Sequence, residues 1–148
     1  MEYSFNMLNL LNSVELQSIS TGRQLIDFTR DAIPANEKIN LSFTIELALN
    51  DDVENNKCLL KLGCKSQVDE IPEGELSPLN LEIVLNYKFN VLEPEIFFQS
   101  NDEIRAQLLS SIVYLDFRTK LTSAFTSVGL SKLRFPLSLE KLKSMGEI

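Results

Sequence analysis

Apolar and polar residues alternate along two stretches of the chain, which predicts two half-buried β-strands. In residues 39–49, INLSFTIELAL, every second residue from Ile39 to Leu49 is apolar, and the residues between them are mostly polar. Residues 80–93, NLEIVLNYKFNVLE, repeat the pattern. Because successive side chains of a strand point to opposite faces, each stretch has one face toward a core and one toward water.

Two less regular stretches complete a predicted antiparallel sheet. Residues 57–68 place two cysteines and two leucines on one face, and residues 14–28 contain Thr21-Gly22, which marks a bulge or bend. One-sided alternation of this kind is typical of a sheet with one wet face. Residues 50–56 read as a polar hairpin loop, whereas residues 69–78 are long enough for a crossover.

After residue 100 the apolar period becomes that of a helix over residues 104–128, which Asn101 or Asp102 can cap and Gly129 can end. The apolar residues of its first half, up to Leu115, form one face. Those of its second half lie about 170° away, at a helical turn of roughly 100° per residue. The second-half residues are Phe117, Leu121, Ala124, Phe125 and Val128.

This change of face has two explanations. Either the helix kinks near residues 114–117, or its halves pack against different partners. One sheet covers one side only, and a chain of 148 residues has little left to cover the other. We therefore expect a second copy of the chain there and a homo-oligomer. The residues predicted to form that interface are Phe117, Leu121, Phe125 and Val128.

The last part of the chain, LSKLRFPLSLEKLKSM, predicts a short second helix. Phe135-Pro136 is an extended break, and Pro136 or Ser138 can begin a helix that carries three leucines on its apolar side. Strands over about 12–93 and helices over about 101–146 make one α+β domain spanning residues 1–148.

Composition argues against enzymatic, metal and nucleic-acid functions. The chain has no histidine, which removes histidine acid–base chemistry and most transition-metal sites. A net charge of −7 disfavours nucleic-acid binding. No Gly-rich phosphate loop occurs, so we expect no nucleotide or other cofactor. Glu93-Pro94-Glu95 fits a solvated turn better than a catalytic pair, and the basic residues near the C-terminus fit an exposed helix end.

The compartment is read from the cysteines and the N-terminus. Cys58 and Cys64 would lie roughly 20 Å apart on one strand, too far for a disulfide. Two buried free thiols fit a reducing cytoplasm. The start, MEYSFNMLNLLNS, lacks the basic residues and cleavage site of a signal peptide. The sequence contains no run of about 18 apolar residues, the length that a membrane-spanning helix needs.

The order of these elements resembles the SecB family of export chaperones. Four amphipathic strands precede the long helix in LLSSIVYLDFRTKLTSAFTSVGL, and LRFPLSLEKL leads into a terminal helix. The family has an arginine in the middle of a kinked helix, matched by Arg118, a glycine matched by Gly129, and a Pro-containing segment matched by Phe135-Pro136. The resemblance covers residues 12–145 and leaves the role of residues 1–11 open.

The resemblance implies a tetramer, a dimer of dimers, with long helices between two outer sheets. It implies an ATP-independent holdase that binds unfolded polypeptides in apolar grooves lined by strands, a long loop and the terminal helix. The client-binding candidates are Ile71, Leu76, Leu79, Phe97, Phe98, Leu137, Leu139 and Leu142. Closing one end of the core, or docking the terminal helix, is the alternative role for these residues.

Two features differ from the family's export members. Their outer sheet carries an acidic patch that docks a translocase motor, whereas the wet strands here mix Glu46 and Glu82 with Lys61, Lys65 and Lys88. The chain also ends at Ile148, without a polar tail. The protein therefore serves either a single dedicated client or general protein export. The translocase motor is the less favoured partner.

The residues alone do not decide the role of Arg118, and they are compatible with two functions other than a holdase. Arg118 fits a structural ion pair or a helix-to-helix hydrogen bond, with Asp116 or a carboxylate of another subunit as partner, better than an anion site. A structural oligomer with no client, and an α+β protein that holds a small apolar ligand, are the competing functions. Reduced aggregation of an unrelated denatured protein would select the holdase, whereas a ligand extracted from the purified protein would select the cavity protein.

Overall fold

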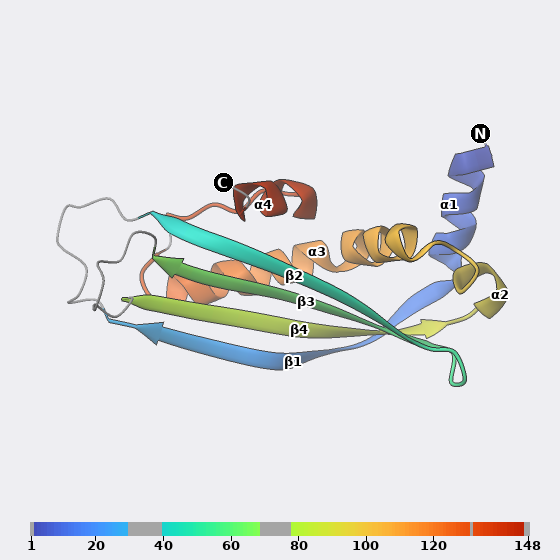
Figure 1. Cartoon of the computed structure of the whole chain (residues 1–148), viewed down its shortest axis with the longest axis horizontal. Helices are drawn as coiled ribbons and strands as arrows, with labels where there is room; N and C mark the ends of the chain where they lie inside the picture. The colour runs from blue at the N-terminus through green and yellow to red at the C-terminus, as the bar shows by residue number, and fades with distance from the viewer. Residues whose placement is uncertain (1, 30–39, 69–77, 131, 147–148) are drawn as a thin grey trace.

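The computed structural model describes residues 2–29, 40–68, 78–130 and 132–146, and it confirms the predicted α+β architecture (Figure 1). A long helix and a short terminal helix follow a four-stranded antiparallel sheet. In chain order the elements are α1 (Glu2–Asn12), β1 (Val14–Phe28), β2 (Leu41–Asp52), β3 (Lys57–Val68), β4 (Leu79–Val91), α2 (Pro94–Phe97), α3 (Asp102–Ser127) and α4 (Leu139–Gly146).

The strand order in space is β1-β4-β3-β2, with every neighbouring pair antiparallel. The connection at residues 69–78 therefore joins two neighbouring strands, and the crossing connection is the one from β1 to β2, which lie at opposite edges. The suggested crossover was thus assigned to the wrong loop, because length alone does not show which strands pair. The bulge expected at Thr21-Gly22 is confirmed by a register shift between Thr21 and Arg23.

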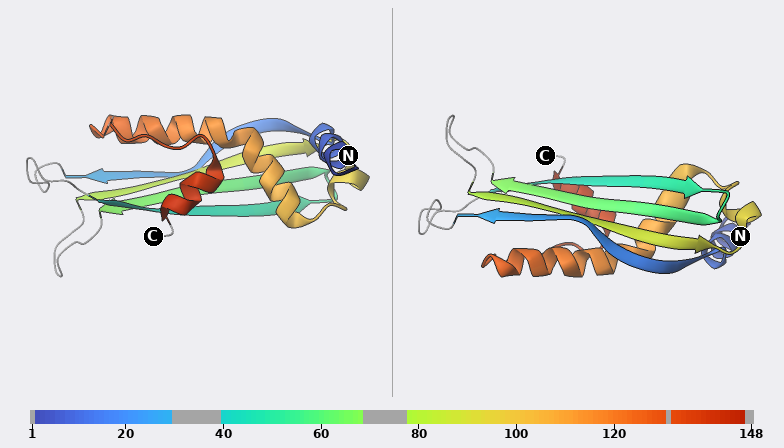
Figure 2. Two further views of the ribbon diagram at one scale, coloured as in Figure 1. Left: turned by 90° about the horizontal axis from the view of Figure 1, so that it is seen from above. Right: turned by 90° about the horizontal axis from the view of Figure 1, so that it is seen from below.

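The hydrophobic core lies between one face of the sheet and the helices α3 and α4, while none of the described helices covers the other face (Figure 2). The central strands β3 and β4 supply most of its strand residues, because both of their edges are paired. Most of their inward side chains are at most 2% exposed: Cys58, Leu60, Leu62, Cys64, Leu79, Leu81, Ile83, Tyr87 and Phe89.

The ends of α3 follow the sequence signals. The Asn101 side chain accepts a hydrogen bond from the Glu103 amide at 2.7 Å, which satisfies one of the free N–H groups of the first turn. At the other end Gly129 has a φ of 86°, and the Leu130 amide donates to the Phe125 carbonyl at 2.9 Å. This left-handed glycine and the bond that follows it end the helix.

α3 bends near its middle, so that its halves run in different directions (Figure 2). Ser110 and Ser111 bond back to carbonyls of the preceding turn, at 2.6 Å each, which is a recognised cause of helix bending. Leu109 in the first half and Leu121 in the second are both fully buried within the single chain. The single chain thus covers the second-half face at Phe117, Leu121 and Phe125, where a second copy was expected, whereas Ile112 and Leu115 of the first-half face stay exposed.

The N-terminal helix α1 was not predicted from the sequence. It stands at the end of the sheet beside α2, where Leu10 is buried while Leu8 and Leu11 are exposed (Figure 1). Ser13, which is fully buried, joins α1 to the sheet because its carbonyl accepts the amide of Leu92 at 2.7 Å.

Candidate functional site

The free edge of the sheet at β2 carries a row of incompletely covered apolar side chains. Those that point toward the helix side are Leu41, Ile45, Leu47 and Leu49, and each is half-buried. Within the described residues no strand pairs with the outer edge of β2. The edge therefore offers unpaired backbone groups beside apolar side chains, the combination by which a sheet accepts an extended peptide.

The terminal helix α4 lies over this edge strand and forms the second wall of the surface (Figure 2). Ser138 caps it, since its hydroxyl accepts the Lys141 amide at 3.3 Å. Leu142 is fully buried and Leu139 half-buried against the core. We call β2 together with α4 the β2–α4 surface.

An aromatic cluster lies where β2, α3 and the C-terminal segment meet. The ring centroids of Phe43 and Phe125 are 5.9 Å apart, and Phe135 lies 5.8 Å from the first and 5.4 Å from the second. Such tilted and edge-to-face pairs add to the stabilisation from buried area. The cluster attaches the C-terminal segment to β2 and α3.

Two side chains of α3 hold the backbone of the same segment. The hydroxyl of Tyr114 donates to the carbonyl of Pro136 at 2.6 Å, and Nε of Arg118 donates to the carbonyl of Phe135 at 3.0 Å. Burial raises the pKa of Tyr114, so its hydroxyl stays protonated and able to donate. The predicted partner of Arg118 was wrong in part, because Asp116 instead bonds to Lys120 and Tyr87, at 2.8 and 2.9 Å.

At the opposite edge, exposed apolar residues come from β1 and α3. Leu16 and Ile19 of β1 are 41% and 38% exposed, and Ile112 and Leu115 of α3 are 39% and 62% exposed. The hydroxyl of Tyr87 in β4, the register partner of Ile19, donates a hydrogen bond to Asp116, which places α3 beside the strand next to β1. We call this the β1–α3 surface.

A buried arginine fixes the start of α3 to the β2–β3 hairpin. The Arg105 guanidinium donates to Asp51 at 2.7 Å and also pairs with Asp102. Its Nε donates to the Ser100 carbonyl at 3.2 Å. The guanidinium carbon Cζ lies 5.1 Å from the centroid of the Phe97 ring. The site is a structural junction, because each of the three guanidinium nitrogens has a hydrogen-bond partner.

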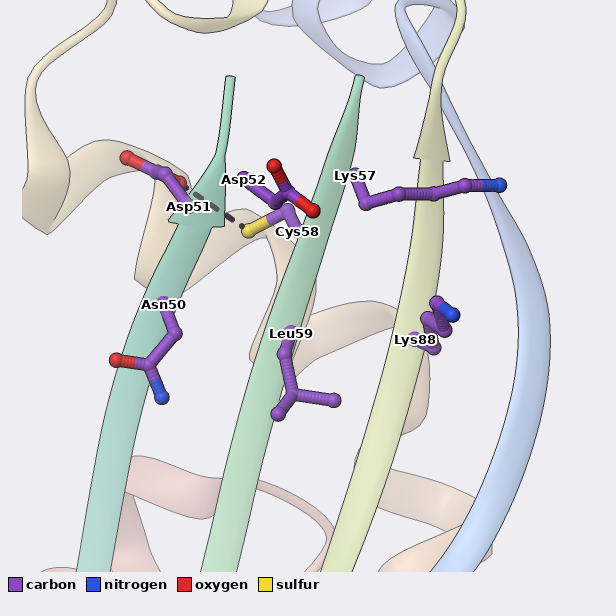
Figure 3. A pocket seen from close by; sticks show the side chains of 7 residues that line it. All are labelled: Asn50, Asp51, Asp52, Lys57, Cys58, Leu59 and Lys88. Carbon is purple, nitrogen blue, oxygen red and sulfur yellow. Dashed lines mark hydrogen bonds between the residues drawn. The ribbon is translucent and has the colours of Figure 1, made fainter. Parts of the chain in front are cut away.

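A shallow hollow beside this junction lies at the ends of β2, β3 and β4 and is lined by Asn50, Asp51, Asp52, Lys57, Cys58, Leu59 and Lys88 (Figure 3). The Cys58 thiol donates to Asp51 at 3.4 Å, and Asp51 is already paired with Arg105. Among the described residues no group of three or more acidic or cysteine side chains could hold a metal ion. The hollow offers no activated nucleophile.

Both cysteines are buried, free and unreactive by their chemistry. Burial raises the pKa of Cys58 and of Cys64 to about 12, from an ordinary value of 9.0. We expect neither thiol to be alkylated at pH 8 in the folded protein, and both to react in urea. The thiols lose their protons at lower pH in the unfolded chain than in the folded protein. Their contribution to the free energy of unfolding is therefore fully present below pH 9 and is lost as the pH rises toward 12. Rapid labelling of the native protein would contradict the buried placement.

The predicted client-binding residues divide into three groups. Leu79, Phe97 and Leu142 are core residues, at most 1% exposed, which favours the core-closing alternative for them. Phe98 and Leu139 are half-buried, and Leu137 is 73% exposed. Ile71 and Leu76 lie outside the described residues.

The predicted interface residues lie in the interior of the single chain. Phe117 and Leu121 are fully buried, Phe125 is 1% exposed and Val128 is half-buried. They are not available for contact with another subunit in this arrangement, because the sheet and the C-terminal segment already cover them. The large apolar residues of α3 that stay exposed are Ile112 and Leu115, on the other side of the helix.

Other predictions concern the sheet and the charged groups. Glu46, Lys61, Lys65 and Lys88 are exposed and Glu82 is half-buried, as expected for the wet face. There Glu82 pairs with Arg23 at 2.5 Å and with Lys65 at 3.2 Å. Pro94, taken for part of a turn, begins α2. Sequence reasoning did not find Tyr114, and a mid-helix tyrosine gives no signal that its hydroxyl binds a backbone carbonyl.

Comparison with solved structures identifies a similar protein with a named function. A SecB-like chaperone from Mycobacterium tuberculosis, solved in complex with a ChAD peptide from the HigA1 antitoxin, matches 93% of this chain and 100% of its own, with a TM-score of 0.67 and 11% identity. A protein of unknown function from Streptococcus agalactiae matches 85% of this chain and 97% of its own, with a TM-score of 0.39 and 14% identity.

Sequence comparison gives no relative, since neither a family model nor a curated protein matches this chain. No helix within the described residues is both long and apolar enough to cross a membrane. At 11% identity the structural likeness concerns the fold. The resemblance seen in the order of elements is therefore confirmed at that level, and this chain has the SecB-like fold.

Proposed function

We propose that the protein is an ATP-independent holdase that binds extended apolar segments of non-native polypeptides along the β2–α4 surface. The observation that carries the proposal is the free edge of β2, where four apolar side chains remain half-buried beside unpaired backbone. The SecB-like chaperone with the same fold was solved with a peptide, which supports a polypeptide as the ligand class.

Two kinds of interaction supply the binding free energy in this proposal. A client strand adds to β2 through backbone hydrogen bonds, which any sequence can make. Its alternate apolar side chains then pack over Ile45, Leu47 and Leu49 beneath α4. Neither step needs nucleotide or a metal, so the protein acts as a stoichiometric binder without catalysis.

Suppression of aggregation tests the proposal. The protein, mixed with an unrelated denatured client at stoichiometric ratios, should lower light scattering without ATP. Replacing both Ile45 and Leu47 by Thr places a β-branched, strand-favouring residue at each position but removes apolar contact. Client affinity should fall about tenfold, since partial burial of two such side chains is worth about 1.4 kcal/mol or more.

The matched control is Ala48→Ser, which lies on the wet face of the same strand and should not change binding. A wild-type protein that leaves aggregation unchanged contradicts the holdase and favours a structural oligomer. A small apolar molecule extracted from the purified protein favours the cavity function instead.

We also propose that the cytoplasmic protein is a homo-oligomer, a tetramer built as a dimer of dimers, held together through the β1–α3 surface. Apolar side chains exposed on two neighbouring elements, such as Ile19 and Leu115, are typical of an interaction surface. A symmetric interface would bury the same residues in both copies.

Leu115→Asp tests this interface. The side chain is 62% exposed in the single chain, so the fold should tolerate a carboxylate there. In an apolar interface the same charge would be buried without a partner, and the oligomer should dissociate. Light scattering coupled to size exclusion should show a tetramer for the wild type and a smaller species for the variant. A monomeric wild type at micromolar concentration contradicts the proposal.

The outer face of the sheet bears on the biological setting. Glu46 and Glu82 are interspersed there with Arg23, Lys61 and Lys65, and Glu82 is neutralised by two ion pairs. This mixture lacks the acidic excess expected for docking of the export motor. We therefore propose a dedicated client in preference to general protein export.

A further inference from the structure

The segment between α3 and α4 is itself an extended apolar peptide bound to the rest of the protein. Residues 133–136 are neither helix nor strand, and of residues 132–138 Phe135 alone is buried. Its ring is 4% exposed and fits between Phe43 of β2 and Phe125 of α3. Phe135 is thus the main apolar anchor of the segment, and the half-buried Leu133 adds a smaller apolar contact.

The backbone of the segment is recognised without reference to its sequence. Arg118 and Tyr114 donate to two consecutive carbonyls, those of Phe135 and Pro136, at 3.0 and 2.6 Å. Every peptide has such carbonyls. A pocket for one aromatic ring with two donors for the adjacent carbonyls would accept many unrelated extended segments.

The pocket also contains a polar group that the segment does not satisfy. The hydroxyl of Ser66 is buried and finds no hydrogen-bond partner among the residues that the structure describes, and Ser66 is the register partner of Phe43 on the same face of the sheet. Buried polar groups are seldom left unpaired, because each costs free energy. The chain's own segment thus fills this place without satisfying all of its groups.

We propose that this place is a client subsite, and that residues 133–136 occupy it as an internal pseudo-client that competes with the client. The inference rests on the proposed function and specifies its ligand: an extended segment with an aromatic side chain followed by two accessible backbone carbonyls. Client binding displaces the segment, so the apparent affinity is reduced by the fraction of molecules in which the segment is docked.

Phe135→Ala tests the competition. Loss of the ring weakens docking of the segment, and the variant should bind an unfolded apolar client at least about fivefold more tightly than the wild type. Lys132→Ala, an exposed position in the same segment, serves as the control and should bind like the wild type. A Phe135→Ala variant that binds no more tightly than a wild type that does bind client overturns the inference. Absence of binding by both proteins overturns the holdase itself.

A peptide added in trans tests the pocket directly. A fluorescent peptide with the sequence of residues 132–138, KLRFPLS, should bind to Phe135→Ala by anisotropy, and the same peptide with Ala for Phe should not. Adding Arg118→Gln and Tyr114→Phe to the variant should remove this binding. Equal binding of both peptides would mean that the ring is not recognised, which contradicts the pocket.

Hydrogen exchange puts the same question to the unmodified chain, in case truncation of the ring impairs folding. Saturation with client should speed exchange across residues 132–138, where the Leu133 amide is now bonded to the Leu130 carbonyl at 3.3 Å. Protection in α3 should remain. Unchanged exchange in the segment at saturation would show that client and segment do not compete.

Discussion

Leu121→Asp should unfold the protein. The side chain is fully buried in the second half of α3, so a carboxylate at this position would be placed in the hydrophobic core. The loss of apolar contact and the buried charge together should cost more than about 4 kcal/mol, a large part of the 5–15 kcal/mol by which native domains are typically stable. Far-UV circular dichroism and urea titration measure the loss.

Ser123→Asp is the matched control, because it adds the same charge to an exposed position two residues away on the same helix. It should retain the wild-type midpoint within about 0.5 kcal/mol. A Leu121→Asp protein that stays folded but becomes monomeric would contradict the core placement. It would restore Leu121 to a subunit interface.

Arg105→Leu should be the second most damaging change. It leaves Asp51, beside the buried Cys58, without its counter-ion, and it frees the Ser100 carbonyl. Removing one partner of a buried pair costs about 3–5 kcal/mol. Because the Asp51 side chain is 28% exposed and can be partly hydrated, we expect about 2–3 kcal/mol here.

A double-mutant cycle with Asp51→Asn isolates the pair, since the amide keeps the size of the carboxylate and removes its charge. The double variant should be less destabilised than the sum of the single changes. Lys120→Met serves as the surface comparison, because its pair with Asp116 is well exposed and should contribute less than about 1 kcal/mol. An Arg105 variant as stable as Lys120→Met would show that the junction does not hold α3 in place.

Local periodicity predicted the strands and the long helix well. The alternation of residues 80–93 arises because β4 has one face in the core, and it is visible without knowledge of the partners. The cap at Asn101 and the left-handed Gly129 are likewise local properties of the backbone. Such features follow from a few neighbouring residues, so a single sequence contains them.

Features that depend on distant contacts were predicted less well. The change of apolar face in α3 is visible in the sequence, but it favoured a second copy of the chain as the cover, whereas the C-terminal segment of the same chain covers Phe125. Apolar residues such as Leu79 and Phe97 look the same in sequence whether they line a groove or close a core. Their burial decides between these roles, and it is set by elements far along the chain.

The half-buried apolar side chains on β2 are a second example of a feature that depends on distant contacts. Residues 39–49 were identified as a strand, yet nothing in their pattern shows that the strand lies at an edge. That position follows from the pairing of β1 with β4, which leaves β2 with one neighbour. The candidate site is thus a consequence of topology, and the sequence contains topology only indirectly.

The separation of β1 from its partner bears on how the chain is made. β1 is the first strand to leave the ribosome, but Val14 pairs with Val91, so it has no edge to join until β4 has been synthesised. The β2, β3 and β4 strands can meanwhile zip together in sequence order, since each pairs with the next. Distant pairing of this kind slows folding and leaves unpaired strand edges exposed to other chains. During its own synthesis the protein is therefore open to the hazard from which we propose it shields its clients.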